Sequence, residues 1–197
     1  MKKTVFSLLI GLLAFSTSFA QVKWEADPAH TNVAFSIGHF GLSFIDGQFT
    51  DLSGSVDAVS EENFDNAKIE FNIDVNSINT RVEARDTHLK SADFFDVDKY
   101  PAITFKNGVL KKGKKNTFTL TGDLTIKDVT KKVTFDVEQN NGIITDPWEM
   151  TRAGFTAKTK INRLDYNINF GADALPNGAE EIAKNVDITV NVEIVRK

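Results

Sequence analysis

The chain has 197 residues, and its 23 Lys and Arg against 27 Asp and Glu give a formal net charge of −4. This excess of acid argues against nucleic acid or an anionic membrane surface as the main partner. The chain has no Cys, which excludes a disulfide framework, a thiolate metal site and lipid attachment at an N-terminal Cys. Packing alone must therefore hold the fold.

The N-terminus has the pattern of a bacterial secretory signal peptide. Lys2 and Lys3 form a basic start, and the run from Val5 to Phe15 is apolar. Ser18-Phe19-Ala20 places small residues before a cleavage site at Gln21, and the apolar run is too short for a stable membrane span. We therefore expect cleavage after residue 20 and a single exported, soluble periplasmic domain over 21–197, with an uncleaved N-terminal anchor as the alternative.

Most of the remaining chain alternates between apolar and polar residues, which is typical of β-strands with one buried face. In one run, Ile69, Phe71 and Ile73 alternate with Glu70 and Asn72. The same pattern recurs over 33–37, 117–126, 132–138, 155–161 and 187–194. Because one face of each strand is polar, the pattern predicts an all-β, antiparallel sheet of eight or nine strands. Closure into a barrel would remove its exposed edges.

Turn-forming residues separate these strands. The segment 111–116 reads KKGKKN, which predicts a solvated hairpin tip in preference to a nucleic-acid site. Asn141-Gly142 and Asp46-Gly47 predict two further turns. The four prolines, at 28, 101, 147 and 176, are expected in loops or at strand starts, where a missing N–H does no harm.

Two segments break the alternation. Residues 81–90, RVEARDTHLK, have helix-forming composition. We expect Thr80 to be the N-cap of a short helix there, with Glu83 completing a capping box. Residues 171–185 are expected to form a long connection, compatible with one helical turn, of the kind that often acts as a lid or mouth.

Several strings resemble the YceI-like family, in order and over nearly the whole chain after the leader. They are Trp24 to Phe49 (WEADPAHTNVAFSIGHFGLSFIDGQF), Thr80 to Phe95 (TRVEARDTHLKSADFF), Tyr100 to Phe105 (YPAITF), Thr121 to Thr134 (TGDLTIKDVTKKVT), and Ile161-Asn162-Arg163 with Asp165. The chain departs from the family pattern at Asp128, where Gly is common. It departs again at Tyr166-Asn167, where an aromatic residue followed by Gly is usual. Both departures are expected in loops or at strand ends.

This resemblance implies a lipocalin-like closed antiparallel barrel of about eight strands, with one short helix near 81–90. It also implies an interior pore for polyprenyl chains, quinone tails or other long amphiphiles, a periplasmic setting, and homodimers in some members. No cofactor is expected beyond such a bound isoprenoid lipid or quinone.

The inward-facing residues of the alternating strands are the candidate apolar lining of that pore. They are Phe35, Ile37, Phe71, Ile73, Phe105, Phe118, Leu120, Phe135 and Phe155. Ordinary core packing is the alternative for each, because periodicity does not distinguish a filled barrel from a hollow one. Arg81 and Arg85, four apart on the expected helix, and His39 are candidates for binding a polar head group at the barrel mouth.

These polar residues have competing interpretations. Salt bridges from Arg85 or Arg163 to Asp86 or Asp165 are favoured over a head-group role, because such pairs are common near surfaces. The three histidines, at 30, 39 and 88, match no short metal-ligand motif, so hydrogen-bonded structural histidines and no metal site are expected. With no Cys and no G-x-S-x-G elbow, the chain has no recognisable nucleophile, and no catalytic residue is expected.

The sequence therefore predicts a non-catalytic protein that binds a long-chain isoprenoid or similar amphiphile inside its barrel. Its expected role is that of a periplasmic carrier or storage protein. The alternative is a barrel with a filled core that acts through protein contacts, in a structural or stress-related role.

Overall fold

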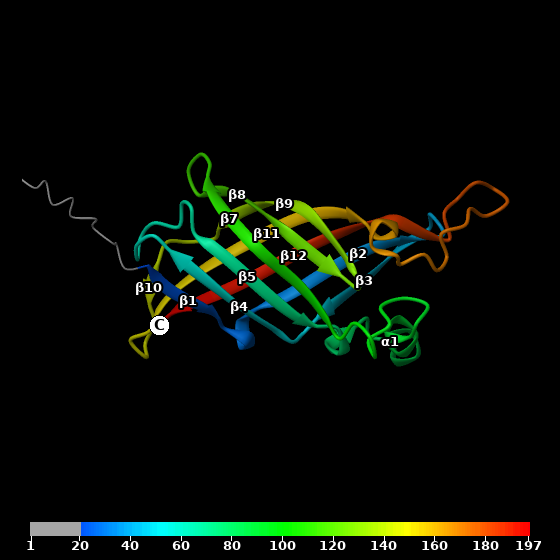
Figure 1. Cartoon of the computed structure of the whole chain (residues 1–197), viewed down its shortest axis with the longest axis horizontal. Coiled ribbons are helices and arrows are strands. Elements are labelled where there is room, and N and C mark those ends of the chain that lie inside the picture. The colour runs from blue at the N-terminus through cyan, green and yellow to red at the C-terminus, as the bar shows by residue number, and fades with distance from the viewer. Residues whose placement is uncertain (1–20) are drawn as a thin grey trace, which may run out of the picture.

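The computed structural model describes residues 21–197, and the expected leader lies outside the described residues. The chain forms a long antiparallel barrel with one α-helix at one end (Figure 1). The strands are β1 (Val22–Ala26), β2 (Asn32–His39), β3 (Ser43–Phe49), β4 (Leu52–Ala58), β5 (Lys68–Asp74), β6 (Ile78–Asn79), β7 (Ala102–Lys112), β8 (Thr117–Ile126), β9 (Val129–Gln139), β10 (Ile144–Thr145), β11 (Thr151–Asn162) and β12 (Ile182–Arg196). The helix is α1 (Glu83–Lys90), and 3-10 turns occur at η1 (Pro28–His30), η2 (Val75–Ser77) and η3 (Arg163–Tyr166).

Eight strand positions close the ring, because three of them are each filled by two consecutive strands. β1 and β2 both pair with β12, and the next position holds β4 beside β1 and β3 beside β2. The third position holds β5 beside β4 and β6 beside β3. The ring then continues with β7, β8, β9 and β11. Pairing of β11 with β12, from Arg152 opposite Val195 to Asn162 opposite Asn185, completes the circle. The expected closed all-β barrel of about eight strands is confirmed.

An aromatic cluster fills the barrel end at which β1 begins. Trp24 is completely buried, and its ring centroid lies 5.3 Å from that of Phe64. Phe64 in turn packs edge-on at 5.1 Å from Phe155 of β11. This end also carries β10 and the C-terminus, whereas α1 and the hairpin between β2 and β3 lie at the opposite end (Figure 1). The barrel is therefore closed by side chains at one end.

The turn expected at Asp46-Gly47 is wrong, because both residues lie within β3. Gly47 pairs across the sheet with Phe35, and a methyl group at Gly47 would overlap that ring. The glycine therefore makes room for an aromatic side chain lying across the strand, a requirement that does not involve a turn. The expected turns at 111–116 and at Asn141-Gly142 do join strands, and the four prolines lie outside strand interiors as expected.

Helix α1 begins two residues later than expected and lacks the expected capping box. Its N-cap is Val82, which makes no side-chain hydrogen bond to the helix. Thr80 instead donates its N–H and its hydroxyl to Oδ1 of Asp86, at 2.8 and 2.5 Å. An acceptor within the helix thus fixes the incoming chain, which is the reverse of the expected capping arrangement. Within residues 21–197, no helix has the length and apolar character needed to cross a bilayer.

The connection before β12 contains no helical turn in its described residues. From Gly171 to Glu181 the chain is a loop pinned by an isolated bridge between Ala174 and Glu180, and β12 begins at Ile182, inside the expected connection. The expectation of a long connection holds, but its last four residues belong to a strand. Ile182 pairs with β2 and Asn185 with β11, while the Ala183 carbonyl accepts from Arg163 and the Lys184 N–H donates to Glu180, so this backbone is not free to form a helical turn.

Candidate functional site

The barrel encloses a cavity of about 380 Å³ with an almost entirely apolar wall. Every one of the eight strand positions contributes side chains to it. Wall residues at the aromatic end, such as Val137 and Phe155, are buried, whereas His39 and Ile182 at the other end are partly exposed. The cavity therefore opens at the end that carries α1. Its volume falls within the range of small-molecule sites.

Eight of the nine apolar residues chosen from the sequence lie in this wall. They are Phe35, Ile37, Phe71, Ile73, Phe105, Leu120, Phe135 and Phe155. The exception is Phe118, which is buried in the closed end, where its ring packs 6.2 Å from that of Phe155 and the Lys112 ammonium sits 4.2 Å above it. Phe118 lies one residue from the start of β8, beyond the open part of the bore. For the other eight, contact with a ligand stays a prediction.

Sequence reasoning missed wall residues that lie outside the strands. Phe64 lies in the loop before β5, Phe94 and Phe95 follow α1, and Phe170 lies in the connection before β12. None of these segments alternates, so a period of two gives no signal there. Phe94 and Phe95 do stand inside a string that resembles the family, which is the one sequence feature that pointed to them.

The polar side chains of the wall, among the described residues, gather at its open end. They are His39, Arg85, His88, Arg163 and Glu181. Arg85 donates from Nε to the Thr80 hydroxyl at 2.7 Å and from Nη2 to the Thr80 carbonyl at 2.8 Å. These two bonds fix the guanidinium, and Nη1 takes part in neither of them. The ring of His39 lies 4.0 Å from that of Phe40. Arg85 and His39, two of the three head-group candidates, both line the cavity.

Arg81 does not reach the wall. It precedes the helix with a φ of 68°, is exposed, and donates its backbone N–H to Asn79 Oδ1 at 2.8 Å. The expectation that Arg81 and Arg85 share a helix face is therefore wrong, because the helix starts only at Glu83.

Arg163 is almost completely buried, with 3% of its surface exposed, and it bonds to backbone in place of a carboxylate. Its guanidinium donates to the carbonyls of Ala183, Ile168, Phe170, Gly171 and Ile182, at 2.6 to 3.2 Å. Burial lowers the pKa of the guanidinium from its usual value. The expected salt bridge to Asp165 is absent from the described chain, and Asp165 faces Lys131 at 3.5 Å. Arg163 thus holds the connection that borders the mouth.

His88 joins the helix to the same connection. Its Nε2 lies 2.8 Å from Asp93 Oδ2, and its ring packs edge-on against Phe94 and Phe170, with centroids 5.0 and 4.9 Å away. The hydrogen bond expected for this histidine is therefore present, and its purely structural role stays a prediction. The expected Arg85–Asp86 salt bridge is wrong in the same region, since both side chains bond to Thr80.

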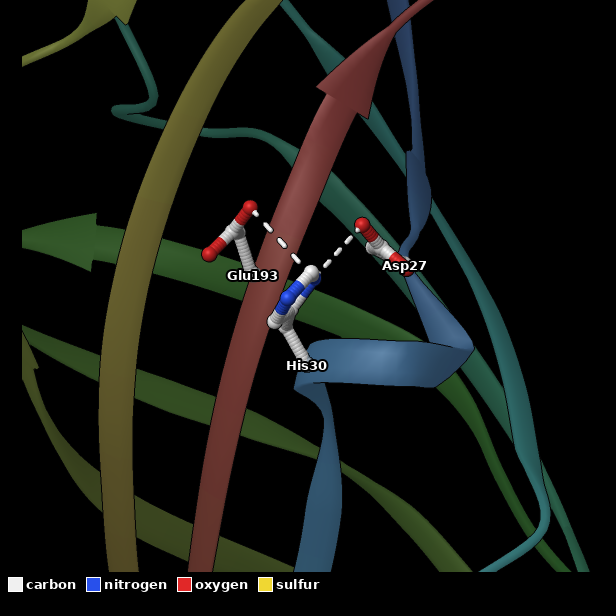
Figure 2. A group of neighbouring side chains, drawn as sticks. All are labelled: Asp27, His30 and Glu193. Atoms are coloured by element: carbon white, nitrogen blue, oxygen red, sulfur yellow. Dashed lines mark hydrogen bonds and ion pairs between the residues drawn. The ribbon is translucent and has the colours of Figure 1, made fainter. Parts of the chain in front are cut away.

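A charged cluster joins η1 to β12 (Figure 2). His30 Nδ1 lies 2.9 Å from Asp27 Oδ2 and 4.0 Å from Glu193 Oε1. The hydrogen bond from His30, and then that from Arg152, lower the pKa of Asp27 to about 2. The bond to Asp27 raises the pKa of His30 above its usual value.

Three potential metal ligands meet in this cluster, yet the arrangement suits an ion-pair network. Nη1 of Arg152 donates to Asp27 Oδ2 at 2.7 Å and to Glu193 Oε1 at 2.5 Å, the same oxygens that face His30. Nε of Arg152 also binds Asp146. A fixed cation already neutralises these carboxylates, so His30 is explained as a hydrogen-bonded residue.

Comparison with known proteins places these features in a family. The sequence model described as "YceI-like domain" matches residues 24–194. The chain is 36% identical over 200 residues to "Protein YceI" from Escherichia coli O17:K52:H18, with both chains covered completely.

Solved structures share the fold. A YceI protein from Campylobacter jejuni is 30% identical, with a TM-score of 0.64 over 82% of this chain and 90% of that chain. A polyisoprenoid binding domain from Saccharophagus degradans gives a TM-score of 0.62 over 91% of this chain and 100% of that one. Its identity is 16%, so this second likeness bears on the fold alone.

Proposed function

The chain belongs to the YceI-like family, and we propose that it binds the apolar tail of a long-chain isoprenoid or similar amphiphile in its barrel. The observation that carries this proposal is the hollow interior. Phenylalanines and aliphatic side chains surround a cavity of about 380 Å³, where a filled core would leave no such space. The hollow interior also favours a binding role over a filled structural barrel. The Saccharophagus degradans domain, a polyisoprenoid binding domain, is an example of a protein of this fold with such a ligand.

The chemistry of the wall suits a tail better than a polar ligand. Each methylene buried from water contributes about 0.8 kcal/mol, so a tail of ten or more carbons offers ample gross affinity. Much of this gross affinity is offset, because the tail loses conformational freedom and because an apolar bore is sparsely hydrated before the tail enters. Apolar contact discriminates little between tails, and the protein is expected to accept several related lipids.

The polar head is proposed to remain at the open end. The aromatic cluster around Trp24 and Phe64 blocks the other end, so a tail entering the bore leaves its head beside Arg85 and His39. The guanidinium of Arg85 is held by Thr80, and Arg85 is part of the cavity wall. It is the group proposed to bind an oxygen of a phosphate or quinone head.

The setting proposed for this binding is the periplasm, as a carrier or storage protein without catalytic activity. The basic start, apolar run and small residues before Gln21 support export. Holding a lipid tail needs only an apolar wall and a fixed mouth, and the described chain provides both.

Filling the bore tests the proposal directly. Ala157 lies in the wall midway along β11, whereas its neighbour Lys158 is exposed on the outer face. Delipidated protein is titrated with a prenylated quinone. Ala157→Phe is expected to weaken binding about tenfold or more because the ring occupies the bore, and Lys158→Phe to bind as the parent does. Equal, undiminished binding by both variants would overturn a site inside the barrel.

A further inference from the structure

The open end of the barrel carries an apolar hairpin, residues 38–44, which we call the mouth hairpin. β2 and β3 meet here, and the Leu42 N–H closes the turn on the His39 carbonyl at 3.0 Å. Leu42 is 86% exposed and Phe44 72%. Two large apolar side chains standing in water on one short hairpin are unfavourable unless another surface covers them.

The mouth hairpin is also free of charge. From Pro28 to Ile45 the sequence contains no Asp, Glu, Lys or Arg, although these residues make up 25% of the chain. The hairpin tip between β7 and β8, in contrast, carries Lys114 and Lys115. Trp148, which is exposed at the other end, has Glu149 beside it and Asp146 two residues before it. An uncharged apolar tip is the kind of segment that enters a bilayer surface at low cost.

In the turn of the mouth hairpin, Gly41 suits the backbone conformation, whereas Phe40 does not. Phe40 and Gly41 have φ values of 55° and 68°, which favour Asn followed by Gly, and Phe at such a φ is strained. The turn is nevertheless held firmly, because the Phe40 N–H donates to the Glu181 carbonyl at 2.9 Å. His39 and Glu181 both belong to the cavity wall. The exposed apolar side chains are therefore fixed beside the opening of the cavity.

We propose that the mouth hairpin docks the barrel on the surface of a lipid bilayer, with Leu42 and Phe44 entering the interfacial layer and the cavity opening against the membrane. This inference rests on the proposed lipid binding, because docking gives an apolar tail a route between bilayer and bore that avoids water. The contact is apolar, so it needs no anionic lipid, which agrees with the chain's net negative charge.

The absence of Cys allows one label to be placed at either end of the barrel. The variants Phe44→Cys and Trp148→Cys are purified from the producing cells, and mass spectrometry establishes their N-terminus. Each is then labelled with an environment-sensitive dye. Each is mixed with vesicles of phosphatidylcholine, with and without phosphatidylglycerol. We expect the emission at position 44 to shift to the blue with both kinds of vesicle, and the emission at position 148 to stay unchanged.

A matched pair of double variants measures the size of the effect. Leu42→Ser with Phe44→Ser is expected to lower the vesicle-bound fraction at least about tenfold, because two apolar side chains lose their burial. Ile144→Ser with Trp148→Ser, which removes two exposed apolar side chains at the opposite end, is expected to leave it unchanged. Thermal melting of all variants checks that the barrel is folded.

Three results would overturn docking: no shift at position 44, an equal shift at position 148, or a shift at 44 that appears without vesicles and grows with protein concentration. The last would mean that a second copy covers the hairpin. Measuring the lipid extracted from each variant distinguishes failure of membrane docking from failure of the proposed lipid binding. Tail binding that survives while docking fails leaves the proposed function standing, and protein that holds no lipid in any variant defeats the proposed function whatever the labels report.

Discussion

The side-chain amide of Asn167 donates a hydrogen bond to Oδ1 of Asp128 at 3.3 Å. The two places at which this chain departs from the pattern of its family therefore lie against each other in space. Asp128 lies in the turn between β8 and β9, and Asn167 ends η3 in the left-handed conformation, with a φ of 59°. Both departures fall in turns, as expected from the sequence, and Asn is the residue after Gly that best tolerates such a φ.

Replacing Asn167 separates the backbone effect from the hydrogen bond. Asn167→Gly is expected to change the free energy of unfolding by less than about 0.5 kcal/mol, because Gly adopts this φ freely and the lost bond is exposed. Asn167→Val is expected to cost about 1–2 kcal/mol through backbone strain. Urea denaturation measures both, and a Val variant as stable as the Gly variant would contradict a left-handed Asn167.

Arg85 and Arg81 form a natural pair of test and control for the head group. Arg85 lies in the cavity wall and Arg81 does not, so Arg85→Gln is expected to weaken a polyprenyl phosphate about tenfold, the loss of one charge-assisted hydrogen bond. A neutral polyprenyl alcohol should lose much less affinity. Titrations of Arg81→Gln should match those of the parent protein. Equal losses for both variants would place the head group away from the wall.

Arg163 is expected to matter for stability more than any exposed charge near it. Arg163→Met leaves five carbonyls without their buried donor and is expected to lower the free energy of unfolding by about 3 kcal/mol or more. Asp165→Asn breaks only an exposed contact with Lys131 and should cost less than about 0.5 kcal/mol. Chemical denaturation of the two variants compares them. Similar small losses would mean that the connection before β12 is held by other contacts.

The cluster of Figure 2 predicts how stability depends on pH on its alkaline side. The hydrogen bond to Asp27 raises the pKa of His30 in the folded chain. The stability it contributes is therefore complete below about pH 6.5, the unfolded value, and is lost as the pH rises through the folded pKa. We expect the Tm to fall as the pH rises above about 6.5, and to fall less in His30→Gln. An identical profile for both proteins would contradict the His30–Asp27 contact.

The acid side of the same cluster has the opposite sign. The pKa of Asp27 is lowered to about 2, first by the bond from His30 and then by that from Arg152. The stability that ionised Asp27 contributes is therefore present above about pH 4, its pKa in the unfolded chain, and is lost as the pH falls through about 2. Acid unfolding followed by circular dichroism should therefore be less steep in Asp27→Asn over this range.

Much of the barrel follows from the sequence because its strands alternate. A period of two places Phe71 and Ile73 on the inner face without any knowledge of the partner strands. The direction of most side chains follows from the same signal, whereas closure of the sheet into a barrel of about eight strands is expected from the family resemblance. Asp46-Gly47 misleads because a turn and an aromatic neighbour both demand glycine, and only the pairing with Phe35 distinguishes them.

The candidate site is less predictable where it leaves the strands. Phe64 and Phe170 reach the wall from irregular segments, whose path depends on tertiary contacts such as those of Arg163. The predicted helix start is wrong for a similar reason, since Asp86 binds Thr80 from within the helix and removes the expected N-cap. Whether the inward phenylalanines interlock or leave a bore depends on packing across the whole ring, which no local pattern encodes.

Native mass spectrometry of the protein, purified without organic solvent or detergent, tests whether the barrel holds a lipid tail. We expect a folded species heavier than the chain by the mass of one isoprenoid-type lipid, and loss of that excess mass on denaturation and in Ala157→Phe. Lipid binding in the bore would be contradicted by protein that runs at the bare chain mass under mild conditions and gains no mass when incubated with prenylated quinone or polyprenyl phosphate.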